Sequence, residues 1–319
     1  MTLRPVDRRR LPPARTPSAE GPPAPTTRRA ESAGDAFEGT RAHGATLAAG
    51  AGAARGAVGP ATLTFKERVN LRVPSASGIA ALSGGRFLVV DDDKGVYLTR
   101  AGGESERVLS SKKRDELGDL EGICLSPEGE DAFLVNEATG RVYRVALDDG
   151  EPDGKPELTG RLPRLGKKGN NKGWEGIDVL PGPCFGDGRD RLVAVHEGKP
   201  RRVGVFALPD LEDGVVLELP AEAKEHLDDI SDVAVDPASG RVFLLSDRSA
   251  TLVEMELRLE KRSAPGAVLD ISRLAFVAVT ELPVKGGEKP EGLCFGADGT
   301  LYVATDGRSR LLSFRVDRE

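Results

Sequence analysis

Three glutamates stand at the same place in a repeated stretch of this sequence. Glu121, Glu175 and Glu291 each precede a Gly and then an Ile or Leu within a short apolar run. A second acidic position follows the next apolar run of each copy, and its members are Asp91, Glu137, Glu197, Asp247 and Asp306. Carboxylates gathered around one opening repel one another, so a bound cation is the simplest way to keep them ionised. If the fold brings these side chains to one place, the sequence predicts a metal site there.

The available donor atoms decide which metal would fit. Carboxylates, hydroxyls, backbone carbonyls and the amide of Asn136 supply oxygen, whereas the Cys and His residues form neither a Cys-x-x-Cys pair nor a paired-His motif. Hard oxygen donors favour calcium, or less readily magnesium, and disfavour zinc. Glu121, Glu175 and Glu291 are the expected ligands, because equivalent positions around an axis converge on one point while the second set lies further out.

Ion pairing is the alternative for the second acidic set. Acids that follow strands also cap turns and form exposed ion pairs. The inner glutamates have fewer arginines within reach, and burial without a partner is costly. Asp178, inside an inner run, is expected either to reach the neighbouring repeat or to be a solvated turn residue. The arginines that follow the second acidic set by one to four residues are Arg141, Arg201, Arg248 and Arg308.

Basic and aromatic residues near the glutamates suggest a ligand site. Lys172 and Lys289 stand in basic segments that lead into the inner runs, where they could hold a phosphate against a metal or could be merely solvated. Trp174 is expected either to wall the opening as a ligand contact or to wedge between repeats. His196, beside Glu197, is the candidate catalytic general base, although a plain surface histidine has the same signature.

The sequence lacks the motifs that usually indicate three classes of enzyme. The Gly-x-Ser-x-Gly, His-Glu-x-x-His and Gly-x-x-x-x-Gly-Lys-Ser/Thr motifs are absent, which argues against a serine hydrolase, a zincin and a P-loop nucleotidase.

Short strands must position these side chains. Beyond Ala61 the apolar runs alternate with Gly, Asp, Asn and Pro turns, and five copies begin at residues 77, 121, 175, 231 and 291. This period and about four strands per copy predict an all-β fold, a five-bladed β-propeller. The start of an innermost strand and the end of its antiparallel neighbour share a rim, so both acidic sets meet on one face. The last copy has three strands, so residues 61–73 are predicted to close the ring.

Composition separates a tail from this body. Residues 1–60 hold eight Pro and eight Gly and are predicted to be a disordered Pro/Ala/Arg/Gly-rich tail, with the propeller over residues 61–319. The whole chain has a net charge of −6, and the tail has nine Arg against five acids, so the body carries −10, which disfavours nucleic acid as a partner.

No apolar stretch is long enough for a membrane span, and no export signal is visible. The sequence as written therefore favours a cytoplasmic location, or the cell envelope if the start codon is misassigned.

The chain resembles the SdiA-regulated family of bacterial proteins, distantly related to NHL-repeat propellers, from Ser77 to Val316. The resemblance implies a five-bladed propeller with a calcium site, and it carries the ligand role to Glu121, Glu175 and Glu291, with Asn136 and Asp247. Family members typically have an N-terminal anchor or export segment, which this sequence does not show. The matching motifs are Asp119-Leu-Glu121-Gly-Ile, Asn136-Glu137, Lys172-Gly-Trp-Glu175-Gly-Ile, Asp229-Ile-Ser231, Leu245-Ser246-Asp247 and Lys289-Pro-Glu291-Gly-Leu.

A second resemblance, to the esterase-like domain of phytase-type proteins, implies an enzyme. Two hypotheses follow: a calcium-binding scaffold that binds a small-molecule or protein ligand at the channel mouth, or a metal-dependent hydrolase of phosphate esters or lactones. A monomer is expected in either case.

Overall fold

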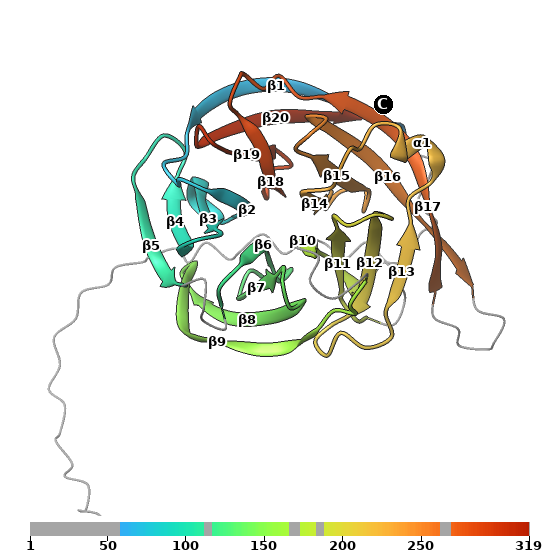
Figure 1. The fold of residues 1–319 in the computed structure, drawn as a ribbon, viewed down its shortest axis with the longest axis horizontal. Helices are drawn as coiled ribbons and strands as arrows, with labels where there is room; N and C mark the ends of the chain where they lie inside the picture. Colours follow the sequence, from blue (N-terminus) through green and yellow to red (C-terminus); the bar gives the residue numbers. More distant parts are fainter. Residues whose placement is uncertain (1–57, 112–116, 166–172, 183–187, 262–268, 319) are drawn as a thin grey trace, which may run out of the picture. The chain divides into compact units, whose positions relative to one another are not determined.

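The computed structural model describes residues 58–111, 117–165, 173–182, 188–261 and 269–318. These residues form five four-stranded antiparallel sheets set around a central axis as the blades of a propeller (Figure 1). Blade 1 contains β2 (Ala76–Ala81), β3 (Arg86–Asp91), β4 (Gly95–Arg100) and β5 (Ser105–Ser110); blade 2 contains β6 (Leu120–Leu125), β7 (Asp131–Asn136), β8 (Arg141–Asp148) and β9 (Glu151–Arg161). Blade 3 contains β10 (Trp174–Leu180), β11 (Arg191–His196), β12 (Arg202–Ala207) and β13 (Val215–Glu218); blade 4 contains β14 (Asp232–Val235), β15 (Val242–Ser246), β16 (Thr251–Lys261) and β17 (Leu269–Glu281). Blade 5 contains β18 (Lys289–Phe295), β19 (Leu301–Asp306), β20 (Arg310–Arg318) and β1 (Ala61–Asn70).

The predicted five-bladed propeller and its closing strand are confirmed. β1 pairs antiparallel with β20, from Ala61 opposite Arg318 to Asn70 opposite Arg310, and so supplies the outermost strand of blade 5. Because a strand from the start of the chain completes the last blade, the ring closes without an unpaired edge on β20. The predicted tail lies outside the described residues up to residue 57, and its boundary at residue 60 stays a prediction.

The core consists of apolar layers between neighbouring blades. One layer joins blades 2 and 3 through side chains such as Phe133, Trp174 and Phe206, and equivalent layers join each of the other neighbouring pairs. A blade buries both faces only when it has a neighbour on each side, so the closed ring is the unit that is stable.

The Glu-Gly motif has a steric cause. A Cβ at Gly78 would lie 2.5 Å from the backbone oxygen of Glu121, and a Cβ at Gly122 would lie 2.6 Å from that of Glu175. Glycine therefore lets β2 pack directly against β6, and β6 against β10. This close approach brings the residue before each glycine towards its counterpart in the neighbouring blade.

Helix is scarce in the described part of the chain. It comprises α1 (Ala221–Lys224) and the 3-10 turn η1 (Ser83–Gly85). No described helix has the length and apolar character that crossing a bilayer requires.

Candidate metal centre at the channel mouth

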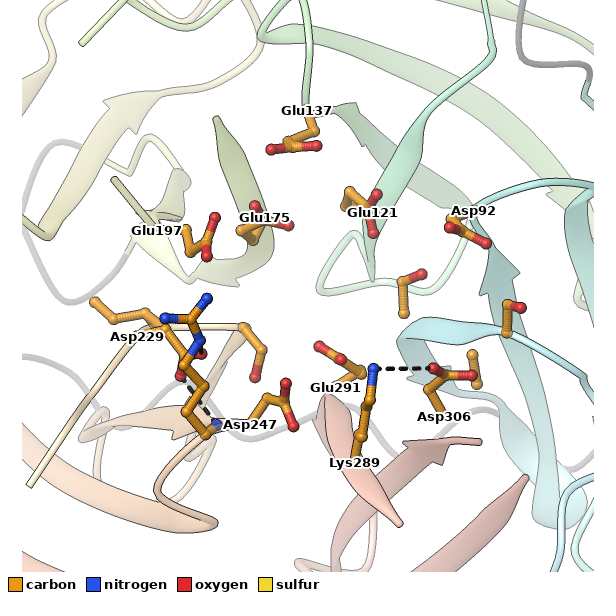
Figure 2. Close-up of a pocket in the computed structure, with 16 residues that line it drawn as sticks. Asp92, Glu121, Glu137, Glu175, Glu197, Asp229, Asp247, Lys289, Glu291 and Asp306 are labelled. Atoms are coloured by element: carbon orange, nitrogen blue, oxygen red, sulfur yellow. Dashed lines mark hydrogen bonds and ion pairs between the residues drawn. The ribbon is translucent and has the colours of Figure 1, made fainter. Parts of the chain in front are cut away.

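A cavity of about 330 Å³ opens where the innermost strands begin. Figure 2 shows acidic side chains from all five blades around it. Its charged lining residues are Asp92, Glu121, Glu137, Glu175, Glu197, Asp229, Asp247, Arg248, Lys289, Glu291 and Asp306. All three inner glutamates and four of the five outer acids, Glu137, Glu197, Asp247 and Asp306, therefore line one cavity.

β-Bulges aim the inner glutamates at this cavity. The pairing of β6 with β7 slips between Leu120 and Gly122, and that of β18 with β19 slips between Pro290 and Gly292. Glu121 and Glu291 are the extra residues at these slips, and Glu175 lies in the equivalent irregularity of β10. A bulge turns one side chain out of the regular alternation, so each glutamate projects into the mouth rather than into the layer between blades.

The outer acids follow a buried polar residue at the end of each second strand. In blade 2 this buried residue is Asn136, whose Oδ1 accepts the backbone N–H of Thr139 at 2.8 Å and whose amide donates to the carbonyl of Gly118. These contacts use the side chain to hold the turn, and Asn136 does not line the cavity. The next residue, Glu137, does.

The same pattern corrects one expected member of the outer set. Asp91 is fully buried, and its carboxylate lies 3.5 Å from the ammonium group of Lys94. Asp92 lines the cavity instead. Asp91 takes the turn-holding place of Asn136, so the cavity residue of blade 1 is one position later than the repeat suggested.

Blades 2 and 3 form an acid-only wall, which we define as Asp119, Glu121, Glu137, Glu175 and Glu197. Two sets of carboxylates there have ligand atoms within 4.8 Å of one another: Asp119 with Glu121 and Glu137, and Glu137 with Glu175 and Glu197. Glu137 belongs to both sets, and the backbone N–H of Gly173 donates to its Oε1 at 3.1 Å. Among the described residues, the sets of three carboxylates that meet this distance are thus on one side of the mouth.

Burial and mutual repulsion raise the pKa values of this wall. Desolvation, followed by the charges of Glu137 and Asp92, raises the pKa of Glu121 to about 9. Desolvation and the charges of Glu137 and Glu121 raise the pKa of Glu175 well above its usual range. No described lysine or arginine lines the cavity on this side. The wall therefore gathers carboxylates whose charged forms are disfavoured.

Blades 4 and 5 form a mixed wall that carries both signs of charge. Its residues are Asp229, Asp247, Arg248, Lys289, Glu291 and Asp306. Desolvation, followed by the charge of Asp247, raises the pKa of Glu291 to about 8, and Lys289 opposes this shift. Glu291 is in neither of the close carboxylate sets, and in Figure 2 it lies across the cavity from Glu137. Arg248, expected to pair with the outer acids, bonds to Asp229 through Nε at 3.2 Å.

Asp178, just below the mouth, does reach the neighbouring blade. Its Oδ2 accepts the backbone N–H of Val235 in β14 at 2.6 Å. Asp232 in β14 makes the equivalent bond to the N–H of Leu293 in β18 at 2.6 Å. These carboxylates join inner strands and are not part of the cavity lining.

Of the remaining predicted site residues, one lines the cavity, two are buried away from it, and one lies outside the described residues. Lys289 lines the cavity. Trp174 is buried between blades 2 and 3, with its indole N–H donating to the carbonyl of Pro163 at 2.9 Å, and the buried ring of His196 packs edge-on against it. Neither Trp174 nor His196 lines the cavity, and Lys172 lies outside the described residues.

Sequence reasoning did not select Asp92, Asp119, Asp229 or Arg248 as site residues. A signal for two of them was present, because Asp119 and Asp229 each stand two residues before the inner position of their repeats. For Asp92, the run of three aspartates from residue 91 to 93 hid the one-residue offset.

Several solved structures are similar to this chain. The chain is similar to glutaminyl cyclase of Myxococcus xanthus, with 14% identity and a TM-score of 0.51 over 81% of this chain and 97% of that one. It is also similar to the PQQ-bound aldose sugar dehydrogenase of Streptomyces coelicolor, with 16% identity and a TM-score of 0.47 over 81% and 99% of the two chains. A putative gluconolactonase gives 17% identity and a TM-score of 0.45 over 82% and 95%. At 14% identity the likeness to the glutaminyl cyclase shows the fold alone.

No curated protein matches the sequence. The family model described as SdiA-regulated matches residues 85–315, which includes the innermost strands of blades 2 to 5 and all three inner glutamates. Since the match spans most of the propeller and the motifs that build its mouth, this chain belongs to the SdiA-regulated family.

Proposed function

We propose that this protein is a metal-binding propeller that holds a divalent cation on the acid-only wall and offers the adjoining cavity to a ligand. The proposal is carried by one observation: Glu137 is shared between two carboxylate sets whose ligand atoms lie within 4.8 Å of one another. Such crowding is unfavourable unless protons or a cation neutralise it.

The donor set fits a hard cation. The wall offers only carboxylate oxygens, which Ca²⁺ accepts in flexible geometries, whereas Mg²⁺ demands a stricter octahedron. We therefore expect Ca²⁺, held by Glu121, Glu137 and Glu175 with Asp119 and Glu197. Glu291 and Asp247, also expected as ligands from the sequence, face the mouth from the mixed wall and would contribute charge there.

Metal binding to purified protein tests this proposal. Wild-type protein is stripped with chelator and titrated with Ca²⁺ and then with Mg²⁺ by calorimetry, with bound metal counted by elemental analysis. Glu137→Gln is expected to weaken Ca²⁺ binding by at least about tenfold, because it removes a charged ligand common to both sets. The matched control is Glu157→Gln, at an exposed glutamate on β9. No Ca²⁺ binding by the wild type, or equal binding by Glu137→Gln, would refute the proposal.

Metal-dependent hydrolysis of a phosphate ester or lactone is the second candidate. Cationic side chains beside the acids of the mixed wall favour it, because they suit an anionic substrate or a developing negative charge. The general base would then be a cavity carboxylate, since His196 does not line the cavity. With Ca²⁺ present, a panel of phosphate esters and lactones should show turnover that Glu121→Gln removes and His196→Ala retains. A panel without turnover at high protein concentration supports the binding role alone.

A further inference from the structure

Two cationic side chains project from the mixed wall into the cavity. Lys289 comes from the start of β18 and Arg248 from the turn after β15. Their side chains are about equally accessible, at 58% and 62% exposed. Figure 2 shows Lys289 reaching towards the interior of the mouth beside Glu291 and Asp306. Both cations therefore face a ligand-sized space rather than the outer surface of a blade.

The partner of Arg248 leaves much of its guanidinium available. Asp229 accepts hydrogen bonds from the hydroxyl of Ser246 at 2.5 Å and from the backbone N–H of Arg248 at 3.3 Å, so local donors hold its carboxylate. The ion pair then uses Nε of Arg248, at 3.2 Å from Oδ2. This contact joins Nε and not the two terminal amino groups, which are the donors that suit oxyanions.

Lys289 is held even less tightly. Its ammonium nitrogen lies 3.9 Å from Oδ2 of Asp306, which is within ion-pair range but beyond hydrogen-bond length. Lys289 and Arg248 line the same cavity, and Asp247, next to Arg248 in the chain, lines it with them. Both cations therefore border one position, the part of the cavity along the mixed wall.

The size and charge of the cavity restrict what can occupy this position. A volume of about 330 Å³ accommodates a small organic molecule. Nine described acids line the cavity against these two cations. Those that are ionised would repel a free anion until a bound metal neutralises the acid-only wall. A ligand with an oxyanion at one end meets that requirement, because the cations and the metal would then attract the same molecule.

We propose that Arg248 and Lys289 form an oxyanion subsite, so that the ligand of the channel mouth is a small molecule bearing a phosphate or carboxylate group. This subsite rests on the proposed metal function, because the acid-only wall must be neutralised first. Arg248 supplies paired N–H donors, and Lys289 supplies a point charge from the adjacent blade. Specificity for the anionic group therefore comes from blades 4 and 5, and metal binding from blades 2 and 3.

Calorimetric titration of the full chain tests the subsite. The probes are phenyl phosphate, which avoids precipitation of calcium phosphate, and acetate, which tests whether a carboxylate suffices; each is added to Ca²⁺-loaded and to chelated protein. The variants are Arg248→Gln and Lys289→Gln. The matched controls are Arg144→Gln and Lys224→Gln, at exposed cations paired with Asp131 and Glu218 away from the cavity. Ca²⁺ affinity is measured separately for every protein.

The expected result is binding of at least one probe by Ca²⁺-loaded wild type and by both controls. Each subsite variant should weaken it by about tenfold, with Ca²⁺ affinity no lower than in the wild type. Stronger binding of phenyl phosphate assigns the subsite to phosphate esters, and comparable binding of acetate assigns it to oxyanions in general. If Ca²⁺ binds but neither probe does, or if the variants bind both probes as well as the controls, the subsite is overturned while the metal function stands. If Ca²⁺ does not bind, the proposed metal function is refuted, and the subsite that depends on it is refuted with it.

Discussion

The carboxylates at the two rims of this propeller have different neighbours. At the mouth, Glu121, Glu137 and Glu175 crowd together on a wall with no described basic residue. At the other rim, where β14 ends and β1 begins, the carboxylate of Glu254 lies 2.7 Å from Nη1 of Arg318. The same residue type is thus paired with an arginine at one rim and crowded against other carboxylates at the other.

At this second rim, Asp236, Glu254, Arg318 and the first residue of β1, Ala61, form what we call the closing seam. Nη2 of Arg318 lies 2.6 Å from Oδ2 of Asp236, and the backbone N–H of Ala61 donates to Oε2 of Glu254 at 2.8 Å. Arg241 adds a bond from Nη2 to the carbonyl of Val58 at 2.7 Å. Buried acids at this rim are thus paired with an arginine of the chain, whereas the acid-only wall at the mouth brings carboxylates close to one another.

Removing the internal cation of the seam should have the largest effect. Arg318→Met leaves the carboxylates of Glu254 and Asp236 buried without their shared partner, so the free energy of unfolding should fall by about 3–5 kcal/mol. Urea denaturation measures this loss. The control is Arg315→Met, whose exposed pair with Asp317 should contribute less than about 1 kcal/mol. Equal losses for the two variants would show that the seam is no stronger than a surface ion pair.

The same substitution should have opposite consequences at the two rims. Glu254→Gln weakens the bond to Arg318 and should cost about 1–3 kcal/mol of unfolding free energy. Glu175→Gln in chelated protein should be neutral or stabilise by up to about 1 kcal/mol, because it removes a carboxylate that burial and Glu137 disfavour. Denaturation of both variants with chelator decides the point. A destabilised Glu175→Gln would mean that the mouth is satisfied without a metal.

The pH dependence of stability should follow the raised pKa values of the carboxylates at the mouth and not the ion pairs of the closing seam. In folded, metal-free protein the pKa of Glu121 rises from 4.5 to about 9 and that of Glu291 from 4.5 to about 8. The folded state therefore binds more protons than the unfolded state across this interval, so stability should fall as pH rises from about 4.5 to about 9.

Ca²⁺ should flatten this fall, because a bound cation replaces the protons as the neutralising charge. Thermal denaturation across the pH range, with chelator and with Ca²⁺, measures both curves, and the double variant Glu121→Gln, Glu291→Gln is the control that should lack most of the slope. Stability of the chelated wild type that is level or rises over this interval would contradict the prediction.

Much of the fold was readable from the chain because a propeller repeats a local pattern. The Glu-Gly positions marked where each inner strand begins, and the missing fourth strand of the last copy pointed to residues 61–73, of which β1 uses Ala61–Asn70. Turn geometry was less readable. The offset between Asp91 and Asp92 depends on which residue is buried to hold the turn, and a run of aspartates carries no such mark.

The sequence alone determined the number of blades, the strand that closes them and the rim where the acids gather, since each follows from periodicity and antiparallel pairing within one repeat. Only the tertiary structure decided which acids belong together: Glu137 joins Glu121 and Glu175, Glu291 faces them with Lys289, and Arg318 closes the far rim. The physical reason is that contacts between blades depend on how neighbouring sheets pack and on where bulges turn individual side chains, and neither is set by spacing along the chain.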